Sequence, residues 1–104
     1  LHVGLRAPER FGAIGAIQPA LRLEEAPRWT ARARAALDRR PGLRLRLLTS
    51  TEDFFRAPVL ATSAAWAAAG VAHEVLTLPG PHDYAFNRGP GAAELVWFHD
   101  RALR

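Results

Sequence analysis

Two loops of this sequence carry residues that could act together as an acid–base pair. Asp53 lies in the segment TSTEDFF, and His82 lies in the segment PGPHDY further along the chain. A carboxylate that accepts a hydrogen bond from imidazole Nδ1 fixes the tautomer of the ring and leaves Nε2 free to take a proton from a nucleophile. Asp53 and His82 are therefore the candidate catalytic residues.

Each of these residues also has a purely structural interpretation. A histidine in a loop is often only solvated, and Asp53 could cap the following helix or bind the backbone of its own loop. Glu52 is a competing acid beside Asp53. Asp83 directly follows His82, and we expect it to point away and to hold the loop by hydrogen bonds. Spacing along the chain does not by itself decide between these interpretations.

The elements that would position the two loops alternate between strands and helices. Short runs that are apolar, or that alternate leucine with arginine, predict strands over residues 12–17, 43–49 and 73–78. Apolar residues at helical spacing predict helices over residues 28–40 and 91–103, and an alanine-rich run between Pro58 and Gly70 predicts a helix over residues 57–69. This alternation is typical of a mostly parallel sheet with right-handed crossovers. The predicted fold class is α/β, with one β-α-β-α-β-α unit over residues 1–104.

The predicted fold brings the two loops to the same end of the sheet. In open α/β sheets, functional groups gather in the loops beyond the carboxyl ends of the strands. Asp53 lies four residues beyond Thr49, and His82 lies four residues beyond Leu78. If the strands that end there are neighbours, we expect a carboxylate oxygen of Asp53 within hydrogen-bond distance of His82 Nδ1.

The chain resembles the C-terminal half of an α/β-hydrolase from the esterase family that contains esterase D-like, feruloyl-esterase-like and enterochelin-esterase-like enzymes. RAPERFGAIGAIQPAL (6–21) is similar to the segment that follows the nucleophile helix in that family. TSTEDFFR (49–56) is similar to the acid loop, and PGPHDYAFNR (79–88) is similar to the histidine loop. The resemblance implies that Asp53 is the acid and His82 the base of a Ser-Asp-His triad in a serine carboxylic-ester hydrolase.

The sequence departs from the family pattern at three loop positions and in one larger feature. Ser50 and Pro81 stand where glycine is usual, and Asn87 stands where an aromatic residue is common. Ser50 and Ser63 are the two serines of the chain, and neither lies in a Gly-x-Ser-x-Gly motif. We therefore expect the nucleophile to lie outside this chain, before Leu1, and the chain alone to be inactive.

Aromatic residues beside the two loops could line a pocket for a small-molecule ester substrate. The expected substrate-binding residues are Phe54, Tyr84 and Phe86. Core packing is an equally good interpretation for half of the aromatic residues near the loops. Three further aromatic residues are expected to pack in the core or between a helix and the sheet: Trp66, Trp97 and Phe98. The alternative function is that of a degenerate hydrolase remnant, a non-catalytic α/β module that binds a protein partner.

Composition argues against several other kinds of site. The chain has no cysteine, which excludes disulfides, thiolate metal sites and a cysteine nucleophile. The histidines and acids show no metal-ligand spacing, so we predict neither a metal nor a cofactor. All 14 basic residues are arginines and the net charge is +4, but the arginines are dispersed and no aromatic platform accompanies them, so we expect no nucleic-acid partner.

Hydropathy and sheet topology bear on location and association. No apolar run approaches the roughly 20 residues that a membrane-spanning helix needs, so we predict no membrane contact and favour a cytoplasmic location. A sheet of three strands leaves unpaired edges, and exposed edges favour association with another strand. We therefore expect self-association through an exposed sheet edge.

Overall fold

The computed structural model describes residues 1–104 and confirms an α/β architecture built on a three-stranded parallel sheet. The strands are β1 (Ala13–Ile17), β2 (Arg44–Glu52) and β3 (Glu74–Pro81). They lie in the order β1-β2-β3, and both neighbouring pairs are parallel. The central strand β2 therefore has β3 as a direct neighbour, as the predicted meeting of the two loops requires.

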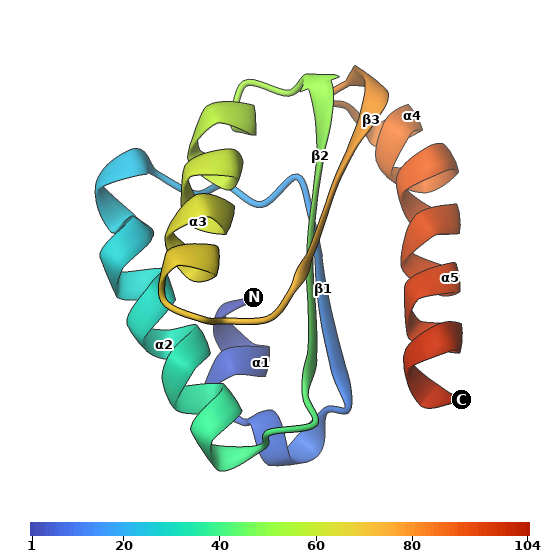
Figure 1. Cartoon of the computed structure of the whole chain (residues 1–104). Helices are drawn as coiled ribbons and strands as arrows, with labels where there is room; N and C mark the ends of the chain where they lie inside the picture. Colours follow the sequence, from blue (N-terminus) through green and yellow to red (C-terminus); the bar gives the residue numbers. More distant parts are fainter.

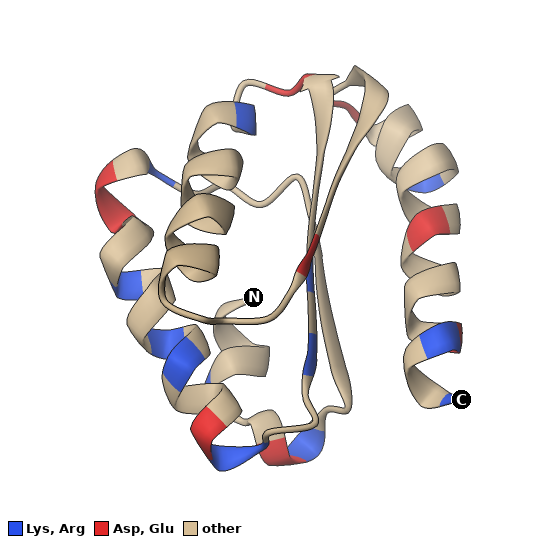
Figure 2. Cartoon of the chain, viewed as in Figure 1, with Lys and Arg blue, Asp and Glu red and all other residues tan.

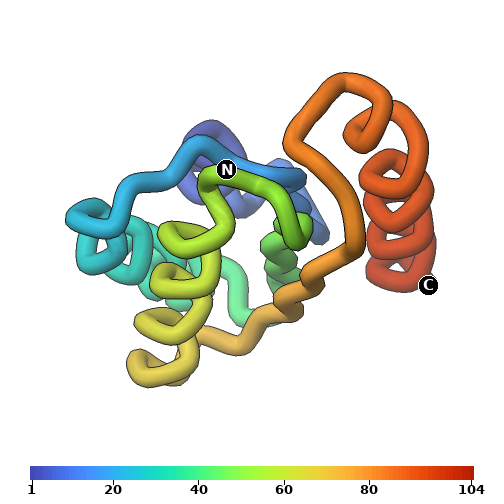
Figure 3. The backbone as a smooth tube through the Cα atoms, turned by 90° about the horizontal axis from the view of Figure 1, so that it is seen from above, coloured from blue at the N-terminus to red at the C-terminus, as the bar shows by residue number.

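Helices cover both faces of this sheet (Figure 1). The helices are α1 (His2–Arg6), α2 (Ala26–Arg39), α3 (Arg56–Ala68), α4 (Tyr84–Phe86) and α5 (Ala92–Leu103). Shorter turns are the 3₁₀ segments η1 (Pro8–Arg10) and η2 (Leu23–Glu25) and the π-helical turn η3 (Asn87–Gly91). Helices α1, α2 and α3 lie on one side of the sheet and α5 lies on the other, an arrangement that is also clear from above (Figure 3).

All three predicted strands and all three predicted helices are present, but the end of β3 differs from the prediction. The strand was expected to stop at Leu78, yet it continues to Pro81, where it pairs with Glu52 after a shift of register. Proline lacks the N–H that a central strand needs, and it is tolerated on an edge strand. Because β3 is an edge strand, its prolines do not end it.

The main core lies between the sheet and the helices α2 and α3. Leu45 and Leu47 of β2 pack there with Ala33 and with Trp66, whose side chain is fully buried. Phe98 of α5 is buried on the opposite face of the sheet, close to Gly15 of β1. Both faces of β2 are therefore covered, and the end of this strand is a rigid base for the loop that carries Asp53.

Two predictions about exposure were wrong. The alternation of leucine with arginine in β2 predicts one apolar and one solvated face, but α5 covers Arg46 on the second face, and its guanidinium pairs with Glu94 at 2.6 Å. Trp97 was expected in the core or between a helix and the sheet, but it is 57% exposed. Consecutive helix residues are about 100° apart, so burial of Phe98 turns its neighbour toward solvent.

The arginines lie among acidic residues rather than in one uninterrupted basic surface. Figure 2 shows basic positions along α2 with acidic positions near both of its ends. Arg28, Arg34 and Arg39 each pair with a nearby acid. None of the helices combines the length and the apolar character that crossing a bilayer requires. Self-association through β1 or β3, the two edge strands, stays a prediction.

Candidate catalytic site

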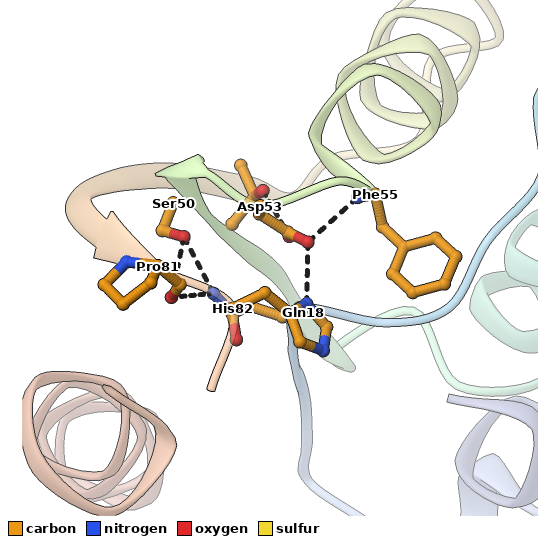
Figure 4. A network of polar contacts seen from close by, with 7 residues as sticks. Gln18, Ser50, Asp53, Phe55, Pro81 and His82 are labelled. Atoms are coloured by element: carbon orange, nitrogen blue, oxygen red, sulfur yellow. Dashed lines mark hydrogen bonds and ion pairs between the residues drawn. The ribbon is translucent and has the colours of Figure 1, made fainter. Parts of the chain in front are cut away.

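The predicted contact between the two candidate residues is present. His82 Nδ1 lies 2.7 Å from Asp53 Oδ1, and Figure 4 shows the two side chains meeting at the ends of β2 and β3. The Asp53 side chain is fully buried, whereas 24% of the His82 side chain remains exposed. The acid is therefore shielded from water while the imidazole keeps access to the surface.

Asp53 is held by its own loop as well as by His82. Thr49 Oγ1 donates to Asp53 Oδ2 at 2.7 Å, and the backbone N–H of Phe55 donates to Asp53 Oδ1 at 2.9 Å. Asp53 therefore binds its own loop and contacts His82 at the same time, because one carboxylate can accept several hydrogen bonds. Glu52, the competing acid, is exposed and forms no ion pair with His82.

The His82 ring is fixed on one edge and free on the other. Asp53 accepts the Nδ1–H, and no protein group bonds to Nε2. Phe54 stacks on the ring with centroids 4.4 Å apart, and Phe55 packs against it at 5.6 Å. This arrangement leaves Nε2 as the atom that can accept a proton.

Asp83 does not compete for the imidazole. Its Oδ1 accepts a hydrogen bond from the backbone N–H of Phe86 at 2.8 Å and so caps the short helix α4. The expectation that Asp83 points away from His82 and holds the loop is confirmed. The loop is therefore anchored on both sides of His82, through the β3 ladder before it and this cap after it.

The three aromatic residues that were expected to bind substrate separate into two groups. Phe54 is 71% exposed and Tyr84 is 75% exposed, so both are accessible. Phe86 is only 3% exposed, and its ring packs close to Gly80 and Gly91. This side chain supports the histidine loop from inside the fold, and it also borders a surface pocket together with Pro81 and Asp83. A substrate-binding role for the three aromatic residues stays a prediction.

Neither serine of the chain reaches His82. Ser50 is buried, and its Oγ accepts a hydrogen bond from Gln18 Nε2 at 2.8 Å. Ser63 Oγ lies 2.7 Å from Nε2 of a different histidine, His73. No group of three or more histidine or acidic side chains could hold a metal ion. The chain thus presents an acid and a base without a serine in contact with that base.

Sequence reasoning missed Gln18 at this site. Gln18 follows β1, is 4% exposed, and has a backbone φ of +45°, in the left-handed region that residues other than glycine rarely adopt. Its Nε2 donates both to Ser50 Oγ and to the carbonyl oxygen of Pro81. One feature of the sequence could have indicated Gln18: it is a polar residue directly after the apolar run GAIGAI, at the carboxyl end of a strand.

Gly80 is a position where a small substitution should disturb the histidine loop. Its φ of +139° is strained for any residue with a side chain, and an added Cβ would lie 2.9 Å from Phe86 Cδ2. We expect Gly80→Ala to lower the free energy of unfolding by about 2 kcal/mol, since backbone strain and overpacking act together. Thermal unfolding followed by circular dichroism measures this change.

Gly42→Ala is the matched control for Gly80→Ala. A Cβ at Gly42 would meet no atom within 4 Å, and this turn lies before β2 rather than beside His82. We expect a change of less than about 0.5 kcal/mol, as for other surface substitutions. Equal melting temperatures for the two variants would contradict the importance of the Gly80–Phe86 contact.

Comparison with models of known protein families, with curated proteins and with solved structures gives no match to this chain.

Proposed function

We propose that this chain is the acid–base part of a serine carboxylic-ester hydrolase. The observation that carries the proposal is the contact of 2.7 Å between the buried Asp53 carboxylate and His82 Nδ1, at the carboxyl ends of two neighbouring parallel strands. Functional groups of open α/β sheets gather at this end. The order of acid before histidine, each after a strand, is the order of α/β-hydrolases and supports the assignment of this chain to the C-terminal part of such a fold.

The proposed mechanism uses the free nitrogen of His82. Nε2 takes the proton of a serine hydroxyl as the serine oxygen attacks the ester carbonyl carbon, and it later gives that proton to the leaving alcohol. A water molecule then attacks the acyl-serine in the same way and releases the acid. Asp53 accepts the Nδ1–H throughout and stabilises the imidazolium that forms in each step, while Phe54 holds one face of the ring.

No residue that contacts His82 in this structure can serve as the nucleophile, so the proposed mechanism needs a serine and oxyanion donors from elsewhere in the protein. Ser50 and Ser63 are both engaged elsewhere, and Nε2 has no hydroxyl partner. We propose that natural sequence preceding Leu1 supplies a serine in a sharp strand-to-helix turn. We call the protein that contains both this upstream sequence and the present chain the joined protein.

The 104-residue chain and the joined protein should differ sharply in esterase activity. The chain alone has a base but neither a nucleophile for it nor donors arranged for the oxyanion, so p-nitrophenyl acetate should be hydrolysed no faster than by free imidazole. The joined protein should show saturable hydrolysis of the same ester. Release of p-nitrophenolate, followed by absorbance, measures both rates.

The alternative is a non-catalytic module that keeps the Asp53–His82 contact only as a structural element. A joined protein without esterase activity on short acyl esters, or an upstream sequence that lacks a serine, would favour this alternative. In that case the exposed Phe54 and Tyr84 would be the first residues to test for contact with a protein partner.

A further inference from the structure

We infer that Gln18 is a positioning residue for His82, an assignment whose catalytic meaning rests on the proposed esterase function. Gln18 belongs to neither of the loops that carry the acid and the base. It follows β1, on the far side of β2 from the histidine loop. Its side chain nevertheless reaches the residue immediately before His82.

The contact is made through the carbonyl group of Pro81. Gln18 Nε2 donates to Pro81 O at 3.0 Å, and Ser50 Oγ lies 3.2 Å from the same oxygen. Figure 4 shows these bonds converging beside the Asp53–His82 pair. The Pro81 carbonyl belongs to the planar peptide group that leads into His82, and the proline ring restricts the backbone before it. Anchoring this oxygen therefore sets the direction from which the His82 side chain departs.

The orientation of the Gln18 amide follows from its partners. A carbonyl oxygen can only accept, so the amide must present its NH₂ group to Pro81. The same NH₂ group donates to Ser50 Oγ at 2.8 Å. The other end of the amide, Oε1, is buried and has no hydrogen-bond partner. The fold therefore uses the donor end of Gln18, and this end points toward the histidine loop.

Two features of Gln18 work against stability. Its backbone is in the left-handed region at φ +45°, and its buried Oε1 is unsatisfied. Strained backbone and unpaired buried polar groups persist where the surrounding structure holds them, and they concentrate at functional sites. The two hydrogen bonds from Gln18 Nε2, to Ser50 Oγ and to Pro81 O, are the contacts that hold this side chain in place.

The test compares the tautomer of the His82 ring, and the exchange rate of its ring proton, in the wild-type chain and in Gln18→Asn. Asparagine tolerates positive φ better than glutamine and keeps an amide, but it is one methylene too short to reach Pro81. Long-range nitrogen–proton NMR correlations report which ring nitrogen carries the proton. The wild type should show the Nδ1–H form, with the proton on the edge that faces Asp53. In Gln18→Asn the Nε2–H form should appear, and exchange of the Nδ1 proton should accelerate about tenfold or more, because two hydrogen bonds are lost.

Three further variants keep the test decisive. Ser50→Ala removes one of the two hydrogen bonds to the Pro81 carbonyl and leaves the bond from Gln18 in place. It should therefore accelerate exchange of the His82 Nδ1 proton by a smaller factor than Gln18→Asn does. This measurement can be made even if Gln18→Asn does not fold. Ser63→Ala removes a hydroxyl bonded to His73 near the other end of β3 and should leave the His82 signals unchanged. Wild-type His82 signals in a folded Gln18→Asn chain, or in Gln18→Gly, which suits the positive φ and has no amide to donate, would overturn the inference.

Activity of the joined protein separates this inference from the proposed function. If both hold, Gln18→Asn should lower kcat about tenfold or more with little change in KM, since ground-state contacts with the ester are untouched. If the esterase proposal fails, the joined protein is inactive, yet the NMR result on the isolated chain still decides whether Gln18 positions His82.

Discussion

His82→Ala is expected to lower kcat of the joined protein for p-nitrophenyl acetate by about 10⁴-fold or more, with a much smaller change in KM. Removing the base of a triad leaves the serine without a proton acceptor, and the rate that remains comes from the oxyanion donors and from substrate binding. The side chain is partly exposed and contributes to no core cluster, so the variant should fold normally. Steady-state kinetics with a circular dichroism spectrum of each protein measure both effects.

His99→Ala is the control for this experiment. His99 lies on α5, away from both loops, and its ring forms no hydrogen bond. We expect its kcat to stay within about twofold of wild type, as for a substitution outside the reacting group. Wild-type-like activity of His82→Ala would remove the basis of the esterase proposal, whatever the geometry of its contact with Asp53.

Replacement of Asp53 should have two separable effects, and comparing Asp53→Ala with Asp53→Asn distinguishes them. Oδ1 of Asp53 accepts from two N–H donors, those of Phe55 and His82, whereas Oδ2 faces the hydroxyl of Thr49. A hydroxyl can accept as well as donate. An asparagine can therefore keep its oxygen toward His82 and its NH₂ group toward Thr49. This variant should lose the negative charge but retain the Nδ1–H form of the ring.

We expect Asp53→Ala to lower kcat of the joined protein by about 10³- to 10⁴-fold and Asp53→Asn to lower it less, because only the alanine variant loses the orientation of the imidazole as well. Asp53→Ala should also lower the free energy of unfolding by about 2 kcal/mol, since the buried donors at Thr49 and Phe55 lose their acceptor. Kinetics and chemical denaturation of the two variants provide these values.

Glu52→Ala is the control for the Asp53 variants, because Glu52 is the adjacent acid, is exposed and does not contact His82. We expect its kcat and stability to remain close to wild type. An equal loss of kcat in Asp53→Asn and Asp53→Ala would show that charge alone, and not the orientation of the ring, is the contribution of Asp53. A large loss in Glu52→Ala would move the role of the acid to Glu52.

Much of the fold could be predicted because its signals are local. The apolar run at residues 12–17, the alternation at residues 43–49 and the helical stripes each depend on residues close together in sequence. The parallel arrangement follows from the alternation of strands and helices, since parallel strands need a crossover between them. The Asp53–His82 contact was predictable for the same reason, because neighbouring parallel strands end at one edge of the sheet.

Exposure was the property that local patterns predicted least well. An alternating strand gives two faces, but it does not say whether a helix covers the polar one, and α5 covers Arg46. Phe86 and Tyr84 are both aromatic neighbours of the same loop, yet one is buried and the other is exposed. The difference is set by the turn of α4, which directs Phe86 toward Gly80.

The sequence by itself determined the α/β class and the pairing of Asp53 with His82 at the carboxyl ends of two neighbouring strands. Only the tertiary structure decided which residues hold that pair in place. Gln18 is 63 residues from Pro81 along the chain, and their contact exists because β1 and β3 flank the same central strand. No local pattern encodes such a contact, since it depends on strand order, on register and on the unusual backbone of Gln18 at the same time.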